Sequence, residues 1–210
     1  MGLFYTIAVG VVAYLIGSIN SSILISKAVM GKDIRESGSG NAGATNMLRT
    51  MGKKYAIITL VIDILKGVVS LLLAKLAINF GAYEVSMYVA GVAAVVGHNF
   101  PVFFGFKGGK GVATSLGVIL LLDWKIGLIT LVIALAIMAV SKYVSLGSVM
   151  AALVFVIIQT VVMIVTDSFD ITRFICVVIL GGLLIIRHRA NIVRLLNGTE
   201  NKLGSKKKSE

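Results

Sequence analysis

SLGSVMAALVFVIIQTVVMIVT, residues 145–166, contains no charged side chain. A helix crosses the roughly 30 Å hydrocarbon core of a bilayer with about 20 apolar residues, because each residue rises about 1.5 Å. The run therefore predicts a membrane-spanning helix. Pro101 is the chain's only proline, so the apolar segments are free of the commonest helix breaker.

Six further apolar runs flank this one, at residues 3–30, 55–78, 84–99, 112–122, 125–141 and 171–186. Hydrophobic residues make up 58% of the 210-residue chain and charged residues 14%, against about 45–50% and about 25% in soluble domains. We predict an all-α integral membrane protein with about seven transmembrane helices in a single domain. The short run at 112–122 is open to three interpretations: a tilted span, a span that borrows loop residues, or a buried half-helix lining a cavity.

The net charge of +11 is concentrated between the apolar runs. This pattern indicates topology and anionic ligands, so no nucleic-acid partner is expected. If residues 31–54 are cytoplasmic, seven alternating spans place 100–111, 142–144 and 187–210 on the same side. Together with Lys27, these regions hold 16 of the 20 Lys and Arg residues. The positive-inside rule then places the N-terminus outside and the C-terminus inside.

The first of three polar segments whose residues suggest ligand binding is DIRESGSGNAGATNMLRTMGKK, residues 33–54. Glycines let the backbone approach a ligand closely, and a helix N-terminus followed by a guanidinium suits a phosphate. The candidate phosphate ligands are Ser39, Asn41, Thr45, Asn46 and Arg49. Asn46 and Arg49, three residues apart, should share one face of the helix that ATNMLR predicts. The alternative is a flexible Gly/Ser linker.

The second segment is GHNFPVFFGFKGGKGVATSLG, residues 97–117. The amides of Gly108, Gly109 and Gly111, the charge of Lys110 and the positive end of the following helix predict a second anion site. It is not a Walker A loop, because glycine rather than Ser or Thr follows the lysine. The alternative is a glycine hinge flanked by lysines that set the topology.

The third segment is RHRANIVRLLNGTENK, residues 187–202, which predicts a basic amphipathic helix that starts at the membrane surface. Arg187, Asn191 and Arg194 recur at helical spacing, as do His188 and Asn191. Anionic lipid headgroups are the expected partners of the basic residues Arg189, Lys202, Lys206, Lys207 and Lys208. For His188 and Asn191, periodicity favours neither a surface role nor a role in the site.

Asp63 and Lys66 lie three residues apart inside the second apolar run, where a structural ion pair is favoured over proton or ion coupling. His98 and His188 are the only histidines, and no carboxylate cluster accompanies them. This composition argues against a protein-bound metal, and we expect no cofactor.

Taken in order, ESGSGNAGATNMLR, GHNFPVFFGFKGGKGVAT and RHRANIVRLLNGTE resemble the motifs of the bacterial acyl-phosphate:glycerol-3-phosphate acyltransferase family. The resemblance covers nearly the whole chain. It implies a seven-helix enzyme of the bacterial inner (plasma) membrane with its active site open to the cytoplasm. The implied reaction moves an acyl group from acyl phosphate to the sn-1 hydroxyl of glycerol 3-phosphate. Its products are lysophosphatidate and phosphate, and it is the first committed step of membrane phospholipid synthesis.

The resemblance implies functional positions in all three motifs: Ser39, Thr45, Asn46, Arg49, Gly108, Gly109, Lys110, Gly111, His188, Asn191 and Glu200. It associates the second motif with glycerol 3-phosphate, and it favours a structural role for Glu200. The predicted catalytic residues are His188, Asn191, Ser39, Arg49 and Lys110. His188 is the best general base, since an unperturbed imidazole titrates near about pH 6.5; the rival base is the donor's own phosphate.

Two other classes of protein stay open. A transporter for a phosphorylated metabolite could use glycine-rich broken helices in the same way, although no internal repeat is evident. A lipid phosphatase would need an activated nucleophile or a metal cluster. The expected partners are acyl phosphate, glycerol 3-phosphate and the lipid bilayer, and a soluble enzyme that supplies acyl phosphate stays open. All three segments must meet around Asn41, Gly109 and Asn191 if they are to hold two phosphate groups together.

Overall fold

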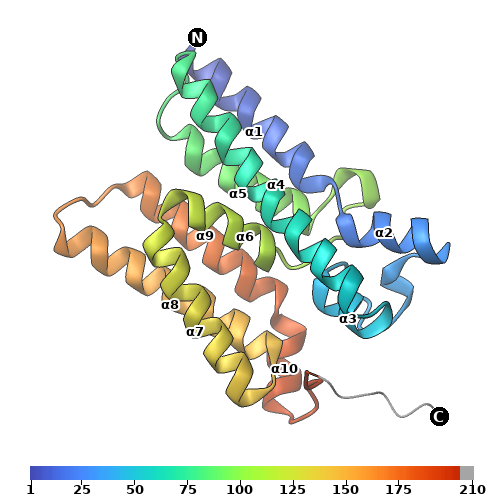
Figure 1. Cartoon of the computed structure of the whole chain (residues 1–210). Helices are drawn as coiled ribbons and strands as arrows, with labels where there is room; N and C mark the ends of the chain where they lie inside the picture. The colour runs from blue at the N-terminus through green and yellow to red at the C-terminus, as the bar shows by residue number, and fades with distance from the viewer. Residues whose placement is uncertain (204–210) are drawn as a thin grey trace, which may run out of the picture.

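The computed structural model describes residues 1–203, so the basic residues Lys206, Lys207 and Lys208 lie outside its described part. The chain forms ten α-helices there, joined by turns (Figure 1). The helices are α1 Gly2–Ser18, α2 Ser21–Met30, α3 Ala44–Thr50, α4 Lys53–Asn79, α5 Ser86–Asn99, α6 Val112–Leu122, α7 Trp124–Ser141, α8 Val144–Val165, α9 Ile171–Arg187 and α10 Arg189–Leu196. Two short 3-10 turns, η1 Ile34–Glu36 and η2 Val102–Phe104, lie in the first and second polar segments.

The helices confirm an all-α membrane architecture. Five segments within the described residues are long and apolar enough to cross a bilayer: Gly2–Met30, Lys53–Asn79, Ser86–Phe104, Trp124–Ser141 and Val144–Val165. A sixth is α9 joined to α10, with a bend of 56° between them. The remaining apolar run forms α6, which has 11 residues and rises only about 16 Å. The expected count of seven is therefore approximate.

The first expected span, 3–30, is not one continuous helix. Ile19 is extended, which ends α1, and Asn20 begins α2 by accepting the Ile23 N–H at 3.2 Å. An asparagine at this position stabilises a new helix start, because its side chain satisfies an amide that has no partner in the helix. The break leaves the Ile19 carbonyl inside the protein, where a lysine binds it, as described below.

Small residues let the helices pack closely. A Cβ atom on Gly17 of α1 would lie 2.1 Å from the Ala94 carbonyl oxygen of α5, and one on Gly117 of α6 would lie 2.2 Å from the Ile64 carbonyl oxygen of α4. Such contacts are typical of helix interfaces in membranes, where close backbone approach rather than the hydrophobic effect drives association. These contacts hold α1 against α5 and α6 against α4, beside a core that includes Leu71, Val95, Val118, Phe155 and Val177.

The polar segments gather at one end of the bundle. Figure 1 shows α2, α3 and α10 at the end opposite the N-terminus, with the chain between α5 and α6 beside them. Along the sides of the bundle many large apolar side chains are exposed: Val132 of α7 and Ile164 of α8 are each 63% exposed. In a membrane such side chains contact lipid. The three segments that carry the sequence motifs therefore share one end of a lipid-facing bundle.

Candidate active site

Asn46, near the start of α3, organises the first segment. Its side chain is 1% exposed, and its oxygen accepts the Ser39 N–H at 2.8 Å. Its amide nitrogen donates, at 3.0–3.1 Å, to the carbonyl oxygens of Ile34, Ser37 and Asn41. Gly38, with φ +62°, is needed beside it, since a Cβ there would lie 2.2 Å from the Asn46 side-chain oxygen. The loop backbone thus occupies both polar atoms of Asn46, and we interpret this residue as shaping the loop rather than as binding phosphate.

The other candidate ligands of the first segment lie closer to the surface. Ser39 and Arg49 are exposed, and Asn41 and Thr45 are half-buried. Arg49 donates to the Asn201 carbonyl oxygen at 3.4 Å, which links the first segment to the third. These side chains are therefore placed on the rim of the loop that Asn46 holds.

In the second segment, the amides of Gly108 and Gly109 are already bonded. Gly108 N–H donates to the Asn99 carbonyl at 3.2 Å, and Gly109 N–H donates to the His98 carbonyl at 3.1 Å. The prediction that both amides face an anion is therefore wrong, because the chain folds back on the end of α5. Gly111, with φ +81°, caps α6 in the left-handed region that favours glycine. The first-turn amides of α6 remain as the candidate anion donors of this segment.

Gly109 marks the place where the first two segments touch. A Cβ on Gly109 would lie 2.1 Å from His98 Nε2 and 2.4 Å from the Ala42 carbonyl oxygen. Only a residue without a side chain fits between the imidazole and the first segment. The glycine pair of the second motif thus serves close packing, which its sequence pattern alone does not distinguish from anion binding.

The third segment binds the second through two side chains. Arg187, the last residue of α9, donates to the carbonyl oxygens of Gly108, at 3.1 Å, and Gly109, at 3.0 and 2.8 Å. Lys110 Nζ donates to the Asn191 side-chain oxygen. The expected meeting of the stretches around Asn41, Gly109 and Asn191 is confirmed by these contacts. Arg187 was not among the predicted site residues, although it recurs at helical spacing with Asn191 and Arg194.

His188 lies at the bend between α9 and α10 and is 3% exposed. Its Nδ1 lies 2.8 Å from the Leu184 carbonyl oxygen, to which it can only donate. The neutral ring therefore has an unprotonated Nε2 that can accept a hydrogen bond. Burial, with a smaller contribution from the charge of Lys110, lowers the pKa of His188 to about 4. The imidazole is neutral at physiological pH.

Glu200 holds the third segment together. Its carboxylate accepts hydrogen bonds from Asn191 at 2.8 Å, Ser145 at 3.0 Å and Arg194 at 2.8 Å. Burial opposes ionisation, but these hydrogen bonds outweigh it and hold the pKa of Glu200 below its ordinary value. Because Asn191 also accepts from Lys110, the carboxylate orients that lysine through the amide. We therefore interpret Glu200 as a residue that holds the third segment in shape.

Positive charge converges on Lys110. Burial lowers the pKa of its ammonium to about 8; Glu200 raises it, and Arg194, Arg49 and Arg187 lower it further. Three arginines and one carboxylate thus act on the Lys110 ammonium in a partly buried region. Such an arrangement attracts an anionic ligand, because the excess charge is only weakly screened there.

A second charged group lies deeper, beneath the glycine segment. Lys66 Nζ lies 3.0 Å from the Asp63 carboxylate, which confirms the pair expected from the sequence. It also lies 2.7 Å from His98 Nδ1, and it donates to the Ile19 carbonyl left free by the break after α1 at 3.1 Å. Ser21 donates to Asp63 at 2.9 Å. This group fixes His98, whose other ring nitrogen packs against Gly109.

Comparison with known proteins identifies the arrangement. The family model described as glycerol-3-phosphate acyltransferase matches residues 7–198 of the chain. The chain belongs to the glycerol-3-phosphate acyltransferase family. This assignment confirms the resemblance drawn from the three motifs, and it favours acyl transfer over the transporter and phosphatase alternatives.

Relatives in this family match over almost their whole length. The glycerol-3-phosphate acyltransferase of Thermoanaerobacter sp. (strain X514) is 45% identical over 96% of this chain and 98% of its own. That of Clostridioides difficile (strain 630) is 43% identical over 99% of this chain and 100% of its own. The crystal structure of PlsY (YgiH), an integral membrane glycerol 3-phosphate acyltransferase in its glycerol 3-phosphate form, superposes with a TM-score of 0.85 at 39% identity, covering 95% of this chain and 96% of that one. The protein is therefore an integral membrane enzyme that acylates glycerol 3-phosphate. This acylation is a reaction of phospholipid synthesis.

Proposed function

We propose that this enzyme takes its acyl group from acyl phosphate and transfers it to the sn-1 hydroxyl of glycerol 3-phosphate. The products are lysophosphatidate and inorganic phosphate. The observation that carries the proposal is that Arg49, Lys110, Arg187 and Arg194 all take part in the contacts where the three segments meet. Two phosphorylated substrates bound side by side require this concentration of positive charge. A second structural relative, at a TM-score of 0.80, is described as a lysophosphatidic acid form of PlsY, which supports the proposed product.

The donor in this proposal is a mixed anhydride, so it is already activated. The hydroxyl oxygen of glycerol 3-phosphate attacks the acyl carbonyl carbon and forms the ester bond. The bond between that carbon and the bridging oxygen breaks, and phosphate leaves with the electron pair. The enzyme then has to align the two reactants and stabilise the oxyanion of the tetrahedral intermediate. Lys110, oriented by Asn191, is our candidate for that stabilisation.

His188 is our candidate for orienting the attacking hydroxyl. Its Nδ1–H is bonded to the Leu184 carbonyl, which leaves Nε2 free to accept the hydroxyl proton in a hydrogen bond. A base with a pKa of about 4 holds a proton poorly at neutral pH. We therefore propose that the proton passes to the departing phosphate, which becomes hydrogen phosphate, and that His188 directs the hydroxyl.

The phosphate groups of the two substrates would be held by the rim of the first loop and by the start of α6. We assign Ser39, Asn41, Thr45 and Arg49 to one group, and Lys110, Gly111 and the first-turn amides of α6 to the other. The acyl chain would lie between helices and enter from the bilayer. By the positive-inside rule this end of the bundle faces the cytoplasm, with the N-terminus outside the plasma membrane.

The test uses purified full-length enzyme with glycerol 3-phosphate and one of three donors: palmitoyl phosphate, palmitoyl-CoA or palmitoyl-acyl-carrier protein. Lysophosphatidate is measured by mass spectrometry. We expect product only with palmitoyl phosphate, and loss of activity in Lys110→Ala and Arg49→Ala. Lys75→Ala, an exposed lysine on α4 far along the chain from the three segments, serves as the matched control. Product from palmitoyl-CoA but not from palmitoyl phosphate would overturn the proposed donor.

A further inference from the structure

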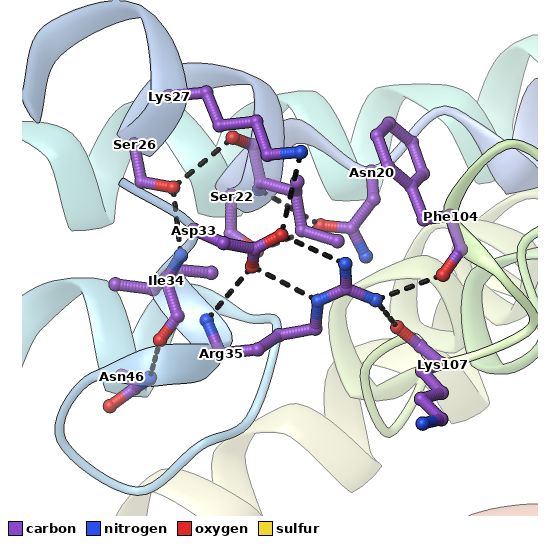
Figure 2. A network of polar contacts seen from close by, with 11 residues as sticks. Asn20, Ser22, Ser26, Lys27, Asp33, Ile34, Arg35, Asn46, Phe104 and Lys107 are labelled. Atoms are coloured by element: carbon purple, nitrogen blue, oxygen red, sulfur yellow. Dashed lines mark hydrogen bonds and ion pairs between the residues drawn. The ribbon is translucent and has the colours of Figure 1, made fainter. Parts of the chain in front are cut away.

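The charged pair Asp33 and Arg35 precedes the glycine-rich part of the first segment and has no part in the chemistry proposed above. The guanidinium binds the carboxylate in a two-point contact, Nε to Oδ1 at 3.0 Å and Nη2 to Oδ2 at 2.8 Å. Its remaining nitrogen, Nη1, donates to the carbonyl oxygens of Phe104 at 2.9 Å and Lys107 at 2.8 Å (Figure 2). One side chain therefore joins the first segment to the second.

The two carbonyl groups belong to a tight turn that leads into the glycine segment. Phe104 N–H and Phe106 N–H both donate to the Pro101 carbonyl, and Phe106 has φ +58°, a value that non-glycine residues seldom adopt. Lys107 directly precedes Gly108. By binding the carbonyl groups of this turn, Arg35 fixes the position from which the chain enters the glycine segment and reaches Lys110.

The other side of the pair is equally well anchored. Ile34, between the two charged residues, donates its N–H to Ser26 of α2 at 3.0 Å. Its carbonyl oxygen accepts from Asn46 at 3.1 Å, and Asn46 shapes the loop that carries the candidate phosphate ligands. Figure 2 shows these bonds on either side of Ile34, with Arg35 reaching across to Phe104 and Lys107. The pair thus connects a loop fixed on α2 with a turn fixed on α5.

The pair differs from an ordinary surface ion pair. The Arg35 and Asp33 side chains are 25% and 9% exposed. Lys27, in contrast, is 53% exposed and lies 3.6 Å from Asp33, a contact that is typically worth little. The hydrogen bonds from Arg35 lower the pKa of Asp33 to about 2, so the pair stays ionised at physiological pH.

We propose that Arg35, held by Asp33, is a positioning residue that sets the separation between the two phosphate-binding segments. The inference rests on the proposed function in so far as it needs two substrates bound side by side. Its physical basis is that a misplacement of about 1 Å between reactants costs about 100-fold in rate. A lysine cannot replace Arg35, because an ammonium group cannot bind a carboxylate at two points and still reach two carbonyl groups.

The test compares Arg35→Lys and Arg35→Ala with Lys27→Gln, which removes the other cation beside Asp33. Steady-state kinetics are measured for both substrates, and rates are corrected for the folded fraction found by thermal unfolding. We expect both Arg35 variants to lose at least about tenfold in kcat, with each KM within about threefold of wild type, because each phosphate site persists while their spacing changes. Lys27→Gln should keep wild-type kcat.

Chemical rescue keeps the proposal falsifiable if the variants fold poorly. Millimolar guanidinium should restore part of the activity of Arg35→Ala, whereas ammonium at equal ionic strength should not. Wild-type kcat in Arg35→Lys, or a loss in Arg35→Ala that guanidinium does not reverse at all, would overturn the positioning role. Each variant is compared with wild type using whichever acyl donor the wild type accepts, so an error in the proposed donor would not be mistaken for failure of this inference.

Discussion

Replacing Gly109 with alanine tests the packing on which the candidate site depends. The new Cβ would lie 2.1 Å from His98 Nε2 and 2.4 Å from the Ala42 carbonyl oxygen, whereas real Cβ contacts essentially never fall below 3.0 Å. Relief requires a movement of at least about 1 Å, because van der Waals contact lies at about 3.5 Å. His98 cannot yield freely, since Lys66 holds its other ring nitrogen at 2.7 Å. The first segment, through Ala42, must therefore move away from the second.

The expected cost has two parts. Overpacking of this kind destabilises a protein by about 1–3 kcal/mol. A displacement of about 1 Å between groups that position reactants lowers the rate by about 100-fold. We therefore expect Gly109→Ala to remain folded at moderate temperature but to lose about 100-fold in kcat/KM. The loss in activity should far exceed any loss of folded protein.

The assay follows lysophosphatidate formation by purified enzyme, with thermal unfolding measured on the same samples. Gly182→Ala in α9 is the matched control, because a Cβ there would meet no atom within 4 Å. Alanine favours a helix over glycine by about 1 kcal/mol, so this control should be at least as stable as wild type and fully active. Near wild-type kcat/KM in Gly109→Ala would refute the reasoning that the three segments must stay in close register.

Further predictions concern the charged groups. His188→Gln should keep at least about a tenth of the wild-type kcat with an unchanged pH profile if His188 only directs the hydroxyl, whereas removal of a true general base would cost about 100-fold or more and abolish its limb of the profile. The pKa of Lys110 is lowered to about 8, so its ammonium is present below that pH and is lost as the pH rises through it. The kcat/KM for glycerol 3-phosphate should therefore fall on the alkaline side of the pH profile. Lys110→Arg should remove that fall, whatever its maximum rate. Asp63→Asn should destabilise the protein by about 3–5 kcal/mol, because it leaves the buried Lys66 without its counter-charge, and Asp63→Asn combined with Lys66→Met should recover part of the loss in a thermal unfolding assay.

The hydrogen-bond partners of each side chain decide how we interpret the predicted site residues. Glu200 was expected to be structural, and its three side-chain donors agree with that role. Asn46 was expected to bind phosphate, but its polar atoms are bonded to the loop backbone. An asparagine in a glycine-rich loop has the same appearance in both cases, because the sequence does not say whether its amide faces inward or outward.

Two residues that were not among the predicted site residues act through backbone carbonyl groups. Arg35 binds the turn at Phe104, 69 positions away, and Arg187 binds Gly109, 78 positions away. A carbonyl group is present at every position and leaves no mark in the pattern of side chains. The sequence around either residue of such a contact therefore does not predict the contact.

By itself, the amino-acid sequence determined the all-helical membrane class, the approximate positions of the spans, the three motif segments and the acyltransferase family. These features depend on local hydropathy and on short motifs, which are read from neighbouring residues. Only the tertiary structure decided the binding of Lys66 to the Ile19 carbonyl, the packing of Gly109 against His98 and the bonds by which Arg35 and Arg187 hold the second segment. Each of these depends on atoms from distant parts of the chain that come together only after the helices have packed.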